Sequence, residues 1–316
     1  MNGVAGTVIQ LVPIAVLVVA GWWLAHRKII AAEVSKPLCD LTFLLLIPAF
    51  LFPELYASDL RQLFDIQAIA TYAGVSLTGM VIVGGLCRRF TNVGAAGTAL
   101  RMMAACQINT AYFAIPVFVQ LFDDAAPVLP VLVLQVCCQT VLVLIILELA
   151  ENHRTAGRHP AVSVARSVTA ALTTPVVIAC AAAIACNIMS LTVPETVLSG
   201  LSFAGEAASP VALIALGLHL GGSTLRLRGA TPDENAIIVV KCVIFPLMVF
   251  GLAEYVLPIS DPWPAYLTML AAMPTPQNVF VLAGRYGGDL DFAGSVVVKT
   301  TFVALLLLPV WTTIVM

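Results

Sequence analysis

The chain has 316 residues, of which 60% are hydrophobic and only 10% are charged, with a formal net charge of −2. Soluble domains carry roughly 45–50% apolar and about 25% charged residues, so this composition excludes a soluble domain and predicts an integral membrane protein. This net charge says little about partners, because what matters in a membrane protein is where the charges lie, and we expect no nucleic-acid partner. The N-terminal stretch lacks the basic region of a signal peptide, so we expect the first apolar run to be a retained helix.

Apolar runs long enough to cross a bilayer recur along the whole chain. A spanning helix needs roughly 20 apolar residues. Ten segments meet this length and leave only loops between them, which predicts an all-α integral membrane protein with ten transmembrane helices. The expected segments are 5–25, 37–56, 67–87, 98–121, 127–147, 167–189, 195–220, 235–257, 263–284 and 292–314.

The basic residues test this helix count. When the loops are assigned alternately to the two faces, every lysine and arginine except Arg61 falls on one face. Basic loops remain in the cytoplasm. The pattern therefore predicts that both chain ends lie outside and that the protein resides in a plasma membrane, which in a bacterium is the inner membrane.

Residue types recur between the two halves of the chain. Pro13 and Pro175 differ by 162 positions, and Gln139 corresponds to Lys299 at a difference of 160. Because each half holds an odd number of helices, the second copy enters the bilayer from the opposite side, as in the inverted repeats of many secondary transporters. The expected parts are a first five-helix repeat at 1–150, a cytoplasmic loop at 151–166 and a second, inverted five-helix repeat at 167–316.

The stretch MPTPQN interrupts the ninth expected helix. Proline has no N–H group, so Pro274 and Pro276 leave the carbonyls of Leu270 and Ala272 without helical partners. Such groups cost several kcal/mol each in hydrocarbon unless protein or water satisfies them. The sequence therefore predicts a non-helical break at membrane depth that lines a polar cavity.

The fourth expected helix carries a matching feature, QINTAYFAIP. Gln107, Asn109 and Thr110 precede Pro116, which frees the carbonyl of Tyr112. Interruptions at corresponding positions of two halves are the best indication of a transporter binding site in a sequence. The alternative is a pair of ordinary kinks whose amide side chains link neighbouring helices.

Ionisable residues inside the membrane are functional hypotheses by default. Lys299 lies well inside the tenth segment, and three interpretations are open. It is a ligand for a substrate anion, the partner of a buried acid, or a residue near the interface if its helix begins later. Glu206 is a candidate for proton coupling if it is buried, or for a structural hydrogen bond. Asp40 either stabilises a helix N-terminus or takes part in coupling. Lys241 is interpreted as snorkelling to the cytoplasmic surface rather than contacting substrate.

Other polar motifs have structural explanations. The spacings Thr231–Glu234 and Thr192–Glu195 predict capping boxes at the starts of two helices. The eight cysteines fall almost entirely in apolar runs without metal-binding spacing, so we expect neither disulfides, nor a metal, nor another cofactor.

Three motifs carry a resemblance to a known family. AAMPTPQNVFVLAGRYG, QINTAYFAIPVF and GEAASPVALIALGLHLGG are similar to stretches of the auxin efflux carrier family, which includes plant PIN proteins and bacterial malonate or malate permeases. The resemblance spans essentially the whole chain, and Pro276 departs from the family pattern, where a small residue is expected. It implies a scaffold of helices 1, 2, 6 and 7 and a transport domain of helices 3–5 and 8–10, with helices 4 and 9 broken and crossing.

The resemblance and the intramembrane polar residues together give a candidate substrate site at this crossing, in which Gln139 would be a neutral neighbour of the substrate. The expected substrate-binding residues are Gln107, Asn109, Thr110, Pro116, Gln139, Pro274, Thr275, Gln277, Asn278 and Lys299.

The predicted function is transport of small organic anions, mono- or dicarboxylates such as malonate or malate, or auxin-like acids, by alternating access. Coupling to protons or sodium, and assembly as a homodimer, stay open. A sodium-coupled symporter of the bile-acid type is the main alternative, although PTP replaces the acidic residue expected to coordinate sodium. An intramembrane enzyme is disfavoured because Asp289 in YGGDLD has no acidic partner within a helix, and a passive channel would lack saturable exchange.

Overall fold

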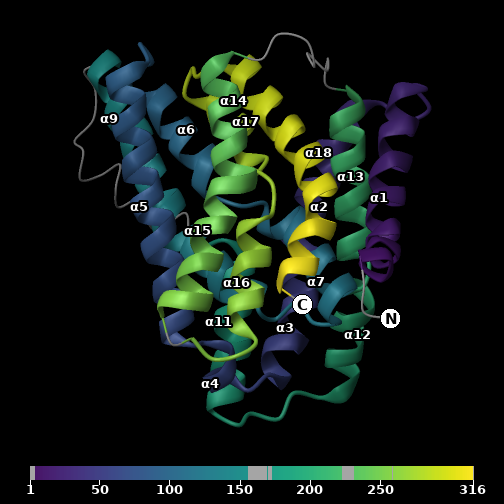
Figure 1. The fold of residues 1–316 in the computed structure, drawn as a ribbon. Coiled ribbons are helices and arrows are strands. Elements are labelled where there is room, and N and C mark those ends of the chain that lie inside the picture. Colours follow the sequence, from purple (N-terminus) through teal and green to yellow (C-terminus); the bar gives the residue numbers. More distant parts are fainter. Residues whose placement is uncertain (1–3, 156–168, 170–172, 223–230, 258, 316) are drawn as a thin grey trace. The chain divides into compact units, whose positions relative to one another are not determined.

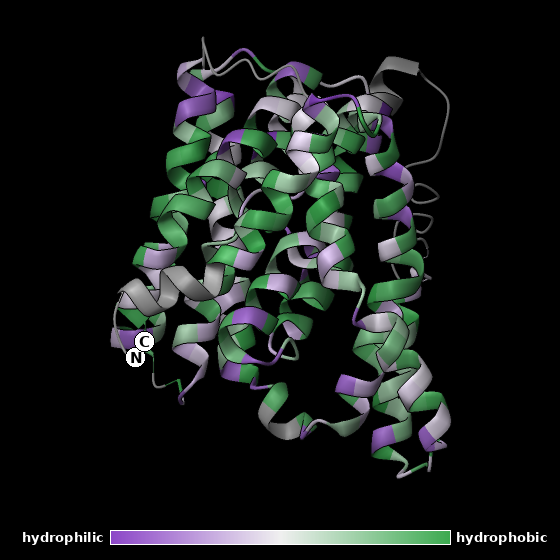
Figure 2. Cartoon of the chain, turned by 90° about the vertical axis from the view of Figure 1, so that its right-hand side faces the viewer, coloured by the Kyte–Doolittle hydropathy of each residue, from purple (hydrophilic) through white to green (hydrophobic). Residues whose placement is uncertain are grey.

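The computed structural model describes residues 4–155, 169, 173–222, 231–257 and 259–315. Throughout these ranges the regular structure is helical, with no strand (Figure 1). Hydrophobic residues make up most of the helical ribbon (Figure 2). The expectation of an all-α integral membrane protein is therefore confirmed for the described residues.

Seven helical stretches of the described chain are long and apolar enough to cross a membrane, and each matches one of the ten expected segments. The helix Pro175–Ile188 and the part Val12–His26 of the first helix are apolar but shorter. The ninth expected segment is divided between two short helices. The arrangement as ten spans in two inverted repeats thus stays a prediction. The seven stretches are Ala32–Ala57, Ile66–Phe90, Ala95–Phe122, Val128–Ala150, Glu195–Gly222, Pro232–Val256 and Leu290–Val315.

The chain forms two compact units. Unit 1 contains the described helices before residue 66, the segment Ala111–Pro130, and the described helices between residues 172 and 224. Its elements are α1 (Val4–His26), η1 (Ala32–Val34), α2 (Ser35–Leu41), η2 (Thr42–Leu46), α3 (Ile47–Ala57), α4 (Leu60–Leu63), α7 (Ile115–Phe122), α11 (Pro175–Ile188), α12 (Glu195–Gly205) and α13 (Ala208–Gly222), with most of η3 (Thr110–Ala114) and the start of α8 (Val128–Leu134).

Helices α1 and α13 run side by side in unit 1 (Figure 1). Two glycines permit this close approach. A Cβ atom on Gly217 would overlap the carbonyl of Val18, and one on Gly21 would overlap the carbonyl of Ile214. Small residues that let backbones approach are the usual basis of helix packing within membranes, where burial of apolar surface supplies little driving force.

Unit 2 holds the remaining described helices. Its elements are α5 (Ile66–Phe90), α6 (Ala95–Cys106), η4 (Gln135–Thr140), α9 (Val141–Thr155), α14 (Pro232–Val239), η5 (Val240–Ile244), α15 (Phe245–Gly251), η6 (Leu252–Val256), α16 (Trp263–Ala271), α17 (Asn278–Arg285) and α18 (Leu290–Val315), together with the end of α8 and Thr110. Its core joins α5, α6, α9, α17 and α18 through buried residues such as Met80, Leu100, Met103, Val143 and Val297.

The expected domains and the compact units share most of their helices. Unit 1 gathers α1 to α3 and α11 to α13, which correspond to expected helices 1, 2, 6 and 7. It also contains Ala111–Pro130, which the expectation placed with helices 4 and 5 of the transport domain. The roles of scaffold and transport domain stay a prediction.

Several helices contain π-helical turns, in which one extra residue widens the helix. Three of these turns, η3, η4 and η5, lie in or beside the segments that the sequence singled out. A π-helical turn leaves part of the regular hydrogen-bond pattern unmade and frequently marks a functional site.

The two predicted capping boxes have different outcomes. At the start of α14, the N–H of Thr231 donates to Glu234 Oε2 at 3.4 Å, and the box is present as predicted. At the start of α12 the prediction is wrong, because the helix begins only at Glu195 and Pro194 occupies the N-cap position. Thr192 therefore lies before the helix and does not cap it.

Candidate functional site

Break 1 is the interruption between α6 and η3. Helix α6 ends at Cys106, and residues 107–109 follow without helical structure before η3 begins at Thr110. The sequence attributed an interruption to Pro116, and that cause is wrong. Pro116 lies in the first turn of α7, downstream of the break. The π-helical turn η3 before Pro116 accommodates its missing N–H group.

Break 2 is the interruption between α16 and α17. Helix α16 ends at Ala271, α17 begins at Asn278, and both prolines of the MPTP stretch lie between them. The carbonyl of Leu270, which Pro274 cannot satisfy, accepts the N–H of Met273 at 3.1 Å. The structure thus contains the interruption that the two prolines predict.

The two breaks contact each other within unit 2. The backbone N–H of Asn109 donates to the carbonyl oxygen of Pro274 at 2.8 Å. The hydroxyl of Thr275 donates to the carbonyl oxygen of Ala104, near the end of α6, at 2.7 Å. Asn109, Pro274 and Thr275, three residues of the predicted site, therefore lie together where the two interrupted segments meet.

Side chains from neighbouring elements satisfy the backbone groups that the breaks expose. Gln135 on η4 accepts the N–H of Ile108 through Oε1 and donates to the Ile108 carbonyl through Nε2, both at 2.8 Å. Thr300 on α18 accepts the N–H of Thr275 at 3.2 Å. The sequence predicted that a polar cavity would meet this need. In the structure, protein groups satisfy these bonds directly, which is the other arrangement that hydrocarbon depth permits.

Lys241 on η5 contributes a cation to break 2. Its side chain is 0% exposed, and Nζ donates to the carbonyl oxygen of Ala271, the last residue of α16, at 3.1 Å. The ammonium also lies over the ring of Phe245, 4.7 Å from its centroid. The interpretation of Lys241 as snorkelling to the surface is therefore wrong, because its charge points into unit 2 and ends at the interrupted helix.

Two glutamines of the predicted site carry unsatisfied polar atoms. Gln107 in break 1 accepts a hydrogen bond from the Thr140 hydroxyl at 3.3 Å, whereas its Nε2 has no partner among the described residues. Gln139 donates to the Ser76 hydroxyl at 2.6 Å, whereas its Oε1 is likewise unsatisfied within the described chain. Both side chains are fully buried, and such atoms are the usual partners of water or ligand.

Exposure is confined to one end of break 2. Asn278, the first residue of α17, is exposed and the preceding Gln277 is half-buried, whereas Asn109, Pro274 and Thr275 are buried. The N-terminus of α17 is also where the positive end of the helix dipole lies. This end of the break is thus the part of the crossing that a solute can contact.

Lys299 lies elsewhere in unit 2. Its Nζ forms an ion pair with Glu234 Oε1 at 2.7 Å, and the Ser295 hydroxyl donates to the same oxygen. Glu234 belongs to the first turn of α14, so Lys299 joins α18 to α14. Of the three roles that the sequence left open, the structure shows the partner of a buried acid.

The two acidic candidates lie in unit 1 and are exposed. Glu206 follows the last residue of α12, where the helix is interrupted before α13 begins. The proton-coupling hypothesis required a buried carboxyl, so this finding removes its premise. Asp40 lies in the last turn of α2. Pro116 is also part of unit 1.

The sequence of the chain places it among known proteins. Residues 7–312 match the model of a family described as membrane transport protein. The chain belongs to this family. An uncharacterized transporter of Methanothermobacter thermautotrophicus is 25% identical over 98% of both chains. A proposed malonate transporter of Rhizobium meliloti is 30% identical over 132 residues, 41% of this chain and 40% of the relative.

The family assignment confirms the resemblance to auxin efflux carriers. This member of the family is accordingly a membrane-embedded transporter rather than an enzyme. Neither the substrate nor the coupling ion follows from the family alone.

Three residues that support the breaks in this transporter lie outside the predicted site: Gln135, Lys241 and Thr300. A signal existed for two of them. Gln135 is an amide in an otherwise apolar run, one helical turn before Gln139. Thr300 stands at the same offset from Thr140 as Lys299 does from Gln139. No pattern in the sequence indicates that Lys241 faces inward.

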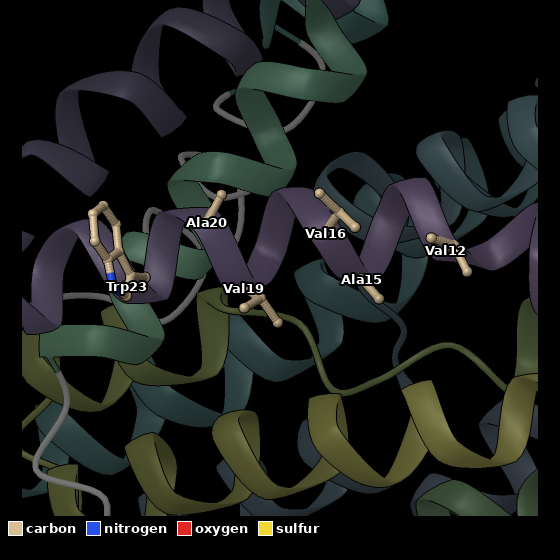
Figure 3. Close-up of a pocket in the computed structure, with 6 residues that line it drawn as sticks. All are labelled: Val12, Ala15, Val16, Val19, Ala20 and Trp23. Atoms are coloured by element: carbon tan, nitrogen blue, oxygen red, sulfur yellow. The ribbon is translucent and has the colours of Figure 1, made fainter.

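The structure also has a shallow apolar depression along α1, well away from the breaks in sequence (Figure 3). All its lining residues belong to one face of this helix, and none is charged. A surface of this kind can contact lipid or another apolar helix, but it offers no group that would select an anion. The lining residues are Val12, Ala15, Val16, Val19, Ala20 and Trp23.

Proposed function

We propose that this family member carries small carboxylate anions, malonate or a close analogue, and that the anion binds in unit 2 where breaks 1 and 2 meet. The observation that carries the proposal is the hydrogen bond from Asn109 N–H to the Pro274 carbonyl, which joins the two interrupted segments. Irregular backbone at membrane depth that is held in place in this way is the usual setting of a transporter binding site.

The chemistry of the exposed end of break 2 favours an anion. The positive dipole end at the start of α17 attracts carboxylates. Asn278, which is exposed there, offers an amide that can donate to one carboxylate oxygen. The 30% identity to a proposed malonate transporter over part of the chain supports a dicarboxylate of this size.

The supports of the two breaks favour an inverted repeat. Thr140 contacts break 1 through Gln107, and Thr300 contacts break 2 through Thr275. The two threonines stand at the offset of 160 that relates the sequence halves (300 − 140 = 160). Each half thus holds its own interrupted helix with the equivalent residue of the next helix, as an internal duplication requires.

The proposed mechanism is alternating access. Unit 2 carries the anion as a rigid body, and unit 1 serves as the scaffold against which it moves, with both chain ends outside a plasma membrane. The substrate-contacting residues are Gln277 and Asn278, and the buried polar neighbours that support them are Gln107, Asn109, Thr110, Gln139 and Thr275. We leave Lys299 out of the contact set because its charge is paired with Glu234.

Uptake of isotope-labelled malonate by proteoliposomes tests this function. We expect saturable uptake and accelerated exchange when unlabelled malonate is present on the other side, and a rise in thermal stability of the purified protein with malonate. Linear, non-saturable flux would contradict a carrier. Absence of both binding and flux for malonate, malate and monocarboxylates would refute the anion proposal.

A further inference from the structure

The two ends of break 2 have opposite electrostatic character. The last carbonyl groups of α16 form the negative end of a helix dipole, and the first N–H groups of α17 form a positive end. Each end is equivalent to about half an elementary charge. The two ends of an interrupted helix therefore nearly cancel, and the interruption alone gives an anion little net attraction.

Lys241 changes this balance. Its ammonium is hydrogen-bonded to the carbonyl of Ala271, at the negative end of break 2. One full positive charge outweighs a dipole end of about −0.5, which leaves the break with a net charge of about +1 once the start of α17 is included. Break 2 becomes attractive to an anion at both of its ends.

No acid neutralises this charge within the described residues. The other buried cations of unit 2 are paired, Arg101 with Asp233 and Lys299 with Glu234. The groups close to Lys241 are the Phe245 ring and the thiols of Cys106 and Cys242. A cation without a counter-charge in a buried setting exerts a stronger field on a nearby anion than a paired or solvated one.

Among the described residues, no such charge contacts break 1. The side chains that hydrogen-bond to it or to the end of α6, Gln135, Thr140 and Thr275, are all neutral. The crossing is therefore electrostatically asymmetric, with a neutral side at break 1 and a positive side at break 2.

We propose that Lys241 is the positioning residue that sets the charge selectivity of the crossing and orients the substrate with a carboxylate toward break 2. This inference rests on the proposed function and deepens it. Lys241 acts through the interrupted helix, since its ammonium is engaged with Ala271, and it needs no direct contact with the substrate.

The test is binding of three probes to the purified full-length protein, measured by isothermal titration calorimetry in detergent. Malonate carries two charges, monomethyl malonate one and dimethyl malonate none. The variant Lys241→Gln removes the charge and keeps a donor for the Ala271 carbonyl. Lys36→Met removes an exposed lysine from unit 1 and serves as the matched control.

We expect Lys241→Gln to weaken the binding of monomethyl malonate at least tenfold and the binding of malonate by a larger factor, because an electrostatic loss grows with ligand charge. If the substitution only disturbed the structure, the binding of both probes would weaken by the same factor. Lys36→Met should bind all three probes as the wild type does. Equal loss for both anions, or unchanged affinities in Lys241→Gln, would overturn the inference while leaving the proposed function intact.

The wild type provides a second test that does not depend on folding of the variant. It should bind dimethyl malonate at least tenfold more weakly than monomethyl malonate, and equal affinities would overturn the inference. Failure of the wild type to bind any of the three probes would refute the proposed function, and the inference with it.

Discussion

Asn278 combines exposure with a position at the start of α17, which makes it the residue most directly available to a substrate in break 2. We expect Asn278→Ala to abolish malonate uptake, because the amide donates to the carboxylate. Exposed substitutions away from packing usually change stability by no more than about 0.5 kcal/mol, so the thermal midpoint should not move. Uptake by proteoliposomes and thermal unfolding of the same preparation measure both effects.

The control for this substitution is Asn92→Ala, which truncates an exposed asparagine in the loop before α6. It should leave uptake unchanged. Retention of wild-type flux in Asn278→Ala would remove this side chain from the proposed site.

Thr275 has a structural role that can be separated from binding. Its hydroxyl joins break 2 to the carbonyl of Ala104 and is fully buried. We expect Thr275→Val, which keeps the shape, to lower the free energy of unfolding by about 1–3 kcal/mol, since the carbonyl loses its donor. Thr313→Val removes an exposed hydroxyl that is hydrogen-bonded within its own helix, and it should lower the free energy of unfolding far less. Equal midpoints for the two variants in a denaturant titration would show that the contact between the breaks contributes no stability.

At the residue scale, the sequence predicted the polar groups of the breaks better than the roles of the charged residues. Prolines and amides inside apolar runs have few explanations other than an interruption, so Asn109 and Pro274 mark the breaks directly in the sequence. Lys241 and Lys299 were interpreted from depth along a helix alone. Depth says nothing about the direction in which a side chain points, and that direction decided both outcomes.

At the scale of elements, break 1 depends on the π-helical turn η4. Its Gln135 makes two hydrogen bonds with the backbone of Ile108. We expect Gln135→Leu to destabilise the protein strongly, because it leaves a buried N–H and a buried carbonyl without partners, each at about 1–3 kcal/mol. Hydrogen exchange measured by mass spectrometry should show faster exchange around break 1 and not around break 2. Unchanged protection of both breaks would contradict the supporting role of Gln135.

Helix α18 is held to α14 by the ion pair of Lys299 and Glu234, whose side chains are only 12% and 6% exposed. Breaking a buried pair from one side costs about 3–5 kcal/mol, because the remaining charge is left unpaired. We expect Lys299→Met to destabilise the protein, and the additional substitution Glu234→Gln to recover much of the loss. A double-mutant cycle in a denaturant titration measures this coupling. Additive effects of the two substitutions would indicate that the pair does not link the helices.

The order of elements follows closely from the sequence, and their internal details do not. Long apolar runs fix where helices lie, because each must satisfy its own backbone in the bilayer. The interruption after Gly205, beside the exposed Glu206, depends on tertiary packing, and the missing capping box before α12 depends on the local geometry of Pro194. No hydropathy pattern reports on either. The cause of break 1 is a related case, because the nearest proline, Pro116, lies downstream of the interruption in the first turn of α7.

At the scale of the whole molecule, the charge carried by the substrate determines how the membrane can drive transport. One elementary charge moved across 100 mV is worth about 2.3 kcal/mol, which is a factor of about 50 in an equilibrium ratio. An anion carrier needs no coupling ion to drive efflux from a cell with a negative interior. We therefore expect malonate flux through this transporter to respond to membrane potential and not to a sodium gradient.

Proteoliposomes with a potassium diffusion potential set by valinomycin measure this directly. An interior-negative potential should slow uptake of labelled malonate and accelerate its efflux, and reversal of the potential should reverse both effects. An imposed sodium gradient at zero potential should change neither rate. Steep dependence on external sodium would instead favour the symporter of the bile-acid type, in which the co-transported cation balances the negative charge of the anion. Flux indifferent to both potential and sodium would mean that the translocated complex carries no net charge. The charge of the anion would then be balanced within unit 2 during the movement.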